Sequence, residues 1–501
     1  MTPATVLTAD PVTPEVALST PLLLGIAGAS IAVLLLLIIR FKVPAFLALL
    51  VVSVAVAVSA RLPLESVFTV VATGVGSTMG KVALLIALGA VLGRLIETSG
   101  GVQSLADRLT SALGPQRTAV ALTAVAFLVA IPVFFEVAVI VLVPVVYAFA
   151  KVLGFQPIRF GLPMAGIALA VHVAVPPHPG IVAGAGVFGA DIGLVLLVSL
   201  VACVPLAVVA HLLGRWMTRR PLSLSPAVAR QVEEFGADGP GTDGSAGSGS
   251  TDGSGGSAGG ATTTAVRPAT GSGVQAPPSA GLVVLLVAAP IVQILLGTGL
   301  TLALGEEHPL FGVATFVGTP VFALLVAVAL AYFLIPVRRR WPLERTGEVM
   351  EGALPPIAAI LLVVAAGGVF GEVLRASGIG AALSGVLDTL GLPLILLAFV
   401  ITLALRAAQG SATVAIVTTA GLLVESVQAG GYSPLQVALL TVAVGFGSLG
   451  LSHVTDAGFW TVTKYFGLSV ADGLRTWTVL TTVLGLLGFG VAWAGWVLTG
   501  A

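Results

Sequence analysis

The chain has 501 residues, of which 57% are apolar and only 9% are charged, whereas soluble domains carry about 25% charged residues. A water-soluble fold of this length needs a charged surface, so the composition excludes that class and predicts an integral membrane protein. The 22 basic residues balance 22 acidic residues, which gives no bulk attraction for nucleic acid. A single cysteine, Cys203, excludes an intramolecular disulfide and a cysteine-based metal cluster.

The N-terminal segment has no lysine or arginine before Arg40, so it lacks the basic region of a cleavable signal. We therefore expect an external tail over residues 1–19 and a retained first membrane span. Apolar runs of about 20 residues predict uninterrupted membrane helices. These runs lie at 20–39, 43–60, 80–98, 191–214, 281–303, 310–335, 353–375 and 475–499.

Four further apolar stretches contain prolines, glycines or charged residues, which a lipid-facing helix avoids. We expect 118–150 and 392–425 to be re-entrant hairpins, and 160–188 and 435–463 to be broken helices. Their breaks should line a protein interior or a wet cavity. Two full spans in place of each hairpin would leave the overall topology unchanged, so this alternative stays open.

Residues 218–279 are rich in Gly, Ser, Thr, Pro and Asp, a composition typical of a flexible, disordered linker. The linker separates a first membrane repeat at 20–217 from a second at 280–501. A shift of 278 positions superposes the breaks of the two halves, which indicates a two-repeat transporter. The matched pairs include Val91 with Val369, Gly93 with Gly371, Ser99 with Ser377, Gly100 with Gly378, Pro132 with Gly410, His178 with Asp456 and Gly180 with Gly458.

With hairpins, each half has about five crossings, and an odd number makes the repeats inverted. Most lysines and arginines then fall on one side of the membrane, whereas only Arg61 and Arg375 fall on the other. Because basic residues favour the cytoplasmic side, we expect both termini outside and the linker in the cytoplasm.

Unwound backbone within a membrane exposes free N–H and C=O groups, and the N-terminus of a half-helix carries partial positive charge that suits a carboxylate. The four breaks are therefore candidate binding segments. Their backbone is shaped by Pro132, Pro176, Pro177, Pro179, Gly180 and Gly458.

Three titratable residues near the breaks are candidates for proton coupling: Glu136, His178 and His172. A carboxylate is costly to keep charged in an apolar environment, so Glu136 can take up a proton. Imidazole titrates near physiological pH, and the prolines beside His178 keep it out of a regular helix. Each of the three can also be a hydrogen-bonded structural residue.

Polar residues at the second hairpin and second broken helix are candidates for substrate binding, because hydroxyl, amide and charged groups match a polyhydroxy acid. Small polar residues also serve helix packing, Arg406 can pair with an acid or snorkel, and Asp456 can cap a helix. The candidates are Arg406, Gln409, Gly410, Ser411, Thr413, Ser452, His453 and Asp456, together with His178.

The absence of two sequence motifs limits which energy sources could drive transport. The sequence has no G-x-x-x-x-G-K-[ST] loop and no H-E-x-x-H, so neither an ATP-driven pump nor a zinc protease is predicted. We expect no metal site and no cofactor, and we expect an ion gradient to drive transport.

Several blocks resemble the gluconate permease family, the gluconate:proton symporters of bacteria. The resemblance implies the ion-transporter superfamily fold, with re-entrant hairpins in a mobile, elevator-type transport domain, a dimerising scaffold and a location in the bacterial inner membrane. Thr455 and Ala457 depart from the family pattern, as does the long linker. The matching blocks are AVLGRLIETSGG (90–101), FFEVAVIVLVPVV (134–146), PMAGIALAVHVAVPPHPG (163–180), LRAAQGSATVAIVTTAGLL (405–423) and SHVTDAGFW (452–460).

The combined prediction is a secondary transporter that imports gluconate, or a related small hydroxy-carboxylate, by proton symport. Its expected partners are the anionic substrate, protons, membrane lipid and a second copy in a homodimer. Three alternatives stay open: a sodium-coupled carboxylate transporter, a symporter of D-serine or a short hydroxy acid from the same family, and a membrane enzyme or receptor.

Overall fold

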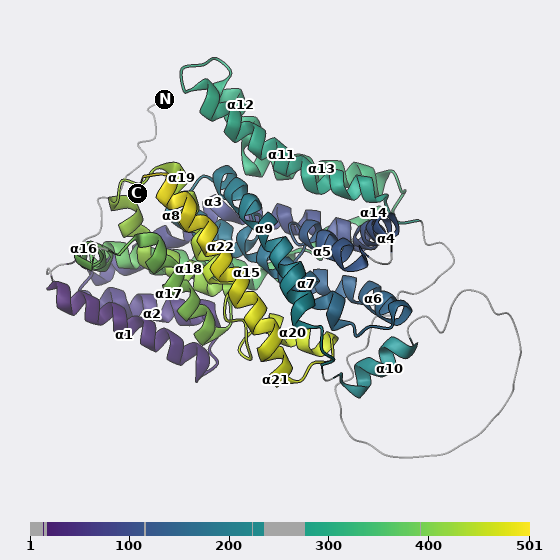
Figure 1. Ribbon diagram of the computed structural model, residues 1–501. Coiled ribbons are helices and arrows are strands. Elements are labelled where there is room, and N and C mark those ends of the chain that lie inside the picture. Colours follow the sequence, from purple (N-terminus) through teal and green to yellow (C-terminus); the bar gives the residue numbers. More distant parts are fainter. Residues whose placement is uncertain are drawn as a thin grey trace, which may run out of the picture.

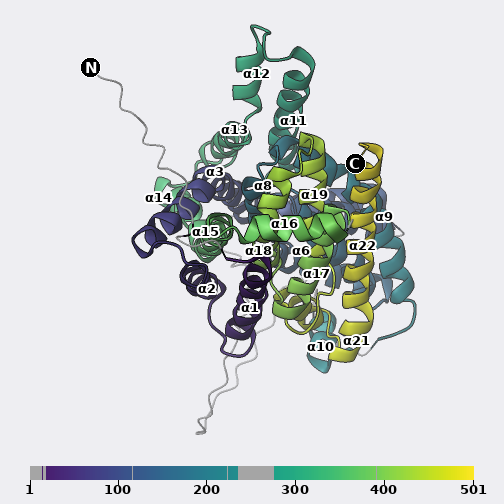
Figure 2. The same cartoon turned by 90° about the vertical axis from the view of Figure 1, so that its left-hand side faces the viewer.

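The computed structural model describes residues 14, 18–114, 117–222, 224–234, 276–390 and 392–500. Within these ranges the chain is built of helices, and no strand is present. Ten helical segments of the described part are long and apolar enough to cross a membrane. The predicted class, an all-α polytopic membrane protein, is confirmed. Figures 1 and 2 show the helices packed into one body, from which α11 (Ala280–Leu304) and α12 (Phe311–Gly318) project in both views.

The first half contains a hairpin and a broken helix at the predicted positions. Helix α5 (Thr118–Val129) has 12 residues, or about 18 Å, which is short of a hydrocarbon core of about 30 Å, whereas α6 (Phe135–Leu153) is long enough to cross one. The elements are α1 (Thr20–Ile39), α2 (Ala45–Ser59), α3 (Leu64–Thr98), α4 (Gly101–Leu113), α5 (Thr118–Val129), α6 (Phe135–Leu153), α7 (Ile158–Ala174), α8 (Pro179–Phe188) and α9 (Ile192–Met217).

The second half has the same order of hairpin and broken helix. After α11 and α12 come α13 (Pro320–Tyr332), the π-helical turn η2 (Phe333–Val337), α14 (Leu343–Glu351), α15 (Leu354–Ala376), α16 (Ile379–Leu390), α17 (Leu394–Gln409), α18 (Ala412–Ala429), α19 (Pro434–Gly447), α20 (Ala457–Tyr465), α21 (Val470–Gly473), the π-helical turn η3 (Leu474–Thr478) and α22 (Val479–Leu498).

Two predicted spans differ from the structure. The span expected at 80–98 is the second part of a 35-residue helix, α3, because the Gly, Ser and Thr residues before it are tolerated where α3 packs on α15. The span expected at 310–335 is divided at Pro320. Proline has no N–H and suits the first turn of a helix, so a new helix begins there.

Helix boundaries recur between the halves at the offset seen in the sequence. Helix α4 begins at Gly101 and α16 at Ile379, whereas α8 begins at Pro179 and α20 at Ala457. Both pairs are 278 residues apart. The two halves therefore agree in the positions at which these helices begin, although few residues are identical between them.

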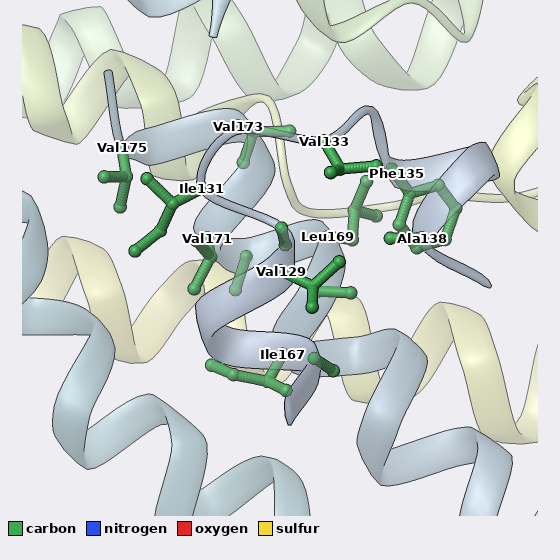
Figure 3. Packing of buried hydrophobic residues seen from close by; sticks show 14 of the residues in the cluster. Val129, Ile131, Val133, Phe135, Ala138, Ile167, Leu169, Val171, Val173 and Val175 are labelled. Carbon is green, nitrogen blue, oxygen red and sulfur yellow. The ribbon is translucent and has the colours of Figure 1, made fainter. Parts of the chain in front are cut away.

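The two halves interlock at the breaks. Helix α6 of the first hairpin packs on α20, and α8 packs on α18 of the second hairpin. Figure 3 shows the apolar contacts behind the first hairpin tip, where buried side chains of residues 129–138 meet those of residues 167–175. Close packing of this kind holds the non-helical turns in place.

The predicted linker contains an ordered helix, α10 (Pro226–Glu234). The Ser225 amide donates to the Gly467 carbonyl at 2.9 Å, and Val228 is buried. Good helix formers with one apolar face explain why this segment folds onto the membrane body. Residues 235–275 of the predicted linker lie outside the described residues.

Helices α3 and α15 approach closely at Gly74, where a Cβ atom would lie 2.6 Å from Cα of Val369. We predict that Gly74→Ala lowers the apparent Tm of the detergent-solubilised protein, because overpacking costs about 1–3 kcal/mol. The matched control is Gly76→Ala in the same helix, where a Cβ meets nothing within 4 Å. Equal Tm values for the two variants would contradict the tight crossing.

Candidate functional site

The four helix breaks border one cavity of about 320 Å³. The first hairpin tip contributes Phe134 and the first broken helix contributes His178, while the second hairpin tip contributes Ser411 and the second broken helix contributes Ala457. Segments far apart in the sequence thus share one wall. The residues singled out from the sequence that line this cavity are Glu136, His172, His178, Arg406, Gly410, Ser411, Thr413, Asp456 and Gly458.

Four helix N-termini are directed to this cavity. The N-caps of α6, α8, α18 and α20 are Phe134, His178, Ser411 and Asp456, and all four line it. The first-turn amides of a helix have no partner within that helix and carry partial positive charge. Their convergence makes the cavity suitable for an anion.

A buried ion pair crosses the second half of the cavity. Arg406 and Asp456 are 2% and 5% exposed, and their side chains are 2.5 Å apart. The Arg406 guanidinium also donates to the Gly410 carbonyl. The Asp456 carboxylate accepts from the Gly458 amide at 3.0 Å and from the Ser452 hydroxyl. The pair therefore fastens the hairpin tip to the broken helix and leaves their summed charge at zero.

Trp477 supports this pair, and sequence reasoning did not identify it. Its indole N–H donates to the Ser452 hydroxyl at 2.7 Å, and its ring stacks on Phe135 with centroids 5.8 Å apart. The Thr478 hydroxyl donates to the Ser452 carbonyl at 2.6 Å. Since Phe135 belongs to the first hairpin, this network joins both halves. No sequence signal marked Trp477, because its role arises from distant segments.

Two histidines lie together at the other side of the cavity. The rings of His172 and His178 meet edge to face, with their centroids 4.2 Å apart. The ring of Phe134 also meets that of His172 edge to face, with the centroids 5.9 Å apart. His178 is buried, and its Nδ1 has no hydrogen-bond partner within the described ranges. Glu136 is half-buried on the cavity wall. None of the ion pairs seen among the described residues includes it.

Three predicted binding residues lie outside the cavity wall. Gln409 ends α17, and its buried Oε1 has no partner in the part of the chain that the structure describes. Ser452 acts behind the wall through Asp456, and His453 is half-exposed in the loop before α20. The wall begins one residue after Gln409, at Gly410, and three residues after His453, at Asp456.

Close backbone approaches explain the glycines at the breaks. Gly410 has φ +81°, a conformation that favours glycine, and a Cβ there would meet the Thr455 carbonyl. A Cβ on Gly180 would lie 3.1 Å from Cα of Thr413. Pro132, Pro176, Pro177 and Pro179 line smaller neighbouring cavities instead of the central one.

The halves differ in charge at equivalent positions. Arg406 and Asp456 correspond, at the offset of 278, to Leu128 and His178. The first half therefore has no counterpart of the ion pair, so only the second half brings a cation to the wall. Across the described residues, no group of three or more His, Cys, Asp or Glu side chains is placed to hold a metal ion.

Two solved structures have a similar fold. The YdaH transporter of Alcanivorax borkumensis matches with a TM-score of 0.52 and 14% identity, over 87% of this chain and 88% of that chain. MtrF of Neisseria gonorrhoeae, described among antimetabolite efflux pumps, matches with a TM-score of 0.57 and 13% identity, over 85% and 84%. At such identities the likeness concerns the fold alone.

Sequence comparisons identify nearer relatives. The inner membrane permease YgbN of Escherichia coli is 46% identical over 96% of this chain and 100% of its own length. A gluconate permease of Pseudomonas aeruginosa is 34% identical over 91% and 93%, and the low-affinity gluconate transporter of E. coli is 33% identical over 92% and 95%. These names describe transporters rather than enzymes, in agreement with a multi-pass inner membrane protein. The family model for GntP family permeases matches residues 21–238 and 264–498, so the chain belongs to the GntP permease family, as its motifs predicted.

Proposed function

We propose that the protein is a secondary active transporter that imports gluconate, or a related small hydroxy-carboxylate, together with protons. The observation that carries this proposal is the convergence of four helix N-termini on one cavity of about 320 Å³. That volume lies in the range of small-molecule sites. Relatives named gluconate permeases support the substrate class.

Substrate recognition would divide between charge and hydroxyl groups. A carboxylate would be held by the amides that begin α18 and α20, where partial positive charge accumulates. The hydroxyl groups of the substrate would bond to Ser411, Thr413 and the half-buried Glu136 on the same wall. A site with several fixed donors and acceptors rejects analogues that leave these groups unpaired.

Charge balance favours proton symport. The charge of Arg406 is already balanced by Asp456, so an entering carboxylate adds a negative charge to a buried space. Glu136 lines the same cavity, and a proton on it would remove one negative charge before the loaded site moves. The His172–His178 pair is the second candidate for the proton, because both rings reach the wall.

We also propose that the halves are inverted repeats, with both termini outside and the linker in the cytoplasm, and that a homodimer works by an elevator movement. The recurring helix starts and the one-sided distribution of basic residues support this arrangement. Inversion would place the two hairpins on opposite sides of the central cavity, which alternating access requires.

Purified protein in liposomes tests the main proposal. We expect accumulation of radiolabelled gluconate when an inward proton gradient is imposed, and its collapse on addition of an uncoupler. Competition by idonate, fructuronate, glycerate, lactate and D-serine ranks the substrates. Replacing sodium by choline at fixed pH is the control for sodium coupling, and loss of uptake in choline would favour that alternative. Indifference of every acid to the proton gradient would overturn the coupling.

Glu136→Gln is predicted to abolish gradient-driven accumulation while keeping exchange of labelled against unlabelled substrate, because exchange needs no net proton movement. Both activities are measured in the same liposomes. The matched control is Glu65→Gln in the first turn of α3, which lies away from the cavity and should transport normally. Intact accumulation by Glu136→Gln would assign the proton to another group.

Asp456→Asn is predicted to reduce uptake strongly and to lower Tm, since breaking a buried pair costs about 3–5 kcal/mol. The double variant Arg406→Gln/Asp456→Asn removes both charges, so we expect it to regain most of the Tm but little of the uptake. Uptake and thermal unfolding are compared in a double-mutant cycle. Normal uptake by the double variant would show that the Arg406–Asp456 pair serves only stability and not transport.

A further inference from the structure

A second polar cavity, of about 300 Å³, lies between α3, α8, α15 and α18. It shares no lining residue with the central cavity. None of its polar residues was assigned a role from the sequence. They are Ser77, Thr78, Lys81, Glu372, Arg375 and Gln428.

Lys81 is the main charge of this second cavity. It lies at the midpoint of α3, 17 residues from both Leu64 and Thr98. Its ammonium group donates to the Gly186 carbonyl at 3.1 Å, and no ion pair with a carboxylate is seen for it in the described ranges. An ammonium has three donors, so this bond leaves two free. Its side chain is exposed at the start of the apolar run of residues 80–98, so the ammonium group is open to a ligand that enters the cavity.

The remaining charges of the cavity are balanced. Arg375 and Glu372 form a bidentate pair, in which Nε donates to Oε2 at 3.1 Å. Glu425 faces this pair but does not line the cavity. The lining therefore carries two cations and one carboxylate, and Lys81 is its one charge without an ion-pair partner in the described ranges. The hydroxyls of Ser77 and Thr78 and the amide of Gln428 surround it with groups that suit a hydroxylated ligand.

The two cavities lie along the same three helices. On α8, His178 lines the central cavity and Gly186, 8 residues later, lines the second cavity. On α15, Val363 lines the central cavity and Glu372, 9 residues later, lines the second. At a rise of about 1.5 Å per residue, the second cavity lies about 12–14 Å farther along. On α8 the displacement starts at the helix break and runs toward the C-terminal end of the helix.

A tightly packed apolar layer separates the cavities. On α18, Ile416 and Val417 fall between the residues that line the two cavities. A Cβ on Gly184 would lie 2.9 Å from the Ile416 side chain, and a Cβ on Gly367 would collide with Val417. At this level α18 therefore packs against α8 and α15 without room for a further side chain.

We propose that the second cavity is a capture site for the carboxylate of a small hydroxy acid, which waits there one apolar layer away from the central cavity. Lys81 binds the carboxylate with its two free donors, and the neighbouring hydroxyl and amide groups bind substrate hydroxyls. The inference rests on the proposed function for the identity of the acid. In the proposed orientation Arg375 is near the outer face, so this cavity receives the acid from outside.

Chemical labelling tests occupancy without transport. The purified protein is treated with an amine-reactive ester in excess sodium gluconate or in equal sodium chloride, and modified lysines are quantified by mass spectrometry. We expect gluconate to protect Lys81 and to leave Lys42, on the loop between α1 and α2, unchanged. Equal modification of Lys81 in both salts overturns the capture site, whatever the transport assay shows.

Uptake kinetics test the consequence. Lys81→Gln should raise KM for the transported acid by about tenfold at low ionic strength and leave kcat within about twofold, since a charged vestibule raises local substrate concentration. Lys81→Arg should restore KM, and Arg61→Gln is the control for a cation outside the cavity. If wild-type protein transports the acid and Lys81→Gln keeps its KM while only Tm falls, Lys81 merely caps α8, and the proposed function stands without the capture site.

Discussion

Backbone polar groups cannot be left unpaired in hydrocarbon, and the rest of this structure depends on that constraint. Each of the four helix breaks interrupts an apolar stretch and leaves amides and carbonyls without helical partners. The fold places them against one another, with α6 on α20 and α8 on α18, so that they face a shared cavity instead of lipid. The same groups that would be costly in lipid thereby line a cavity whose partial positive charge suits an anion.

Charge is distributed unevenly over this nearly symmetric frame. The second half carries Arg406 and Asp456, whereas the equivalent positions of the first half carry Leu128 and His178. One half thus has a neutral, rigid ion pair held by Trp477 and Ser452, and the other has titratable side chains without ion-pair partners in the described part. In the proposed transport cycle, this division would separate the residues that fix the site from those that take up the proton.

The packing between helices also separates the two polar cavities. Glycines at Gly184 and Gly367 let α8 and α15 close upon α18, and this contact lies between two polar cavities. In the proposed capture site, a substrate would be concentrated beside this contact before it passes.

The amino-acid sequence by itself determined the class of fold, the positions of the breaks and the polar residues of the central cavity, because apolar length, proline and glycine act locally. Pro179 begins α8 and Gly410 ends α17 wherever these helices lie. Tertiary structure alone decided that Arg406 pairs with Asp456, that Trp477 supports them, and that Gln409 and His453 lie off the wall. The role proposed for Lys81 also depends on tertiary structure, because its cavity is formed by four helices and no local sequence pattern encodes the contacts between them.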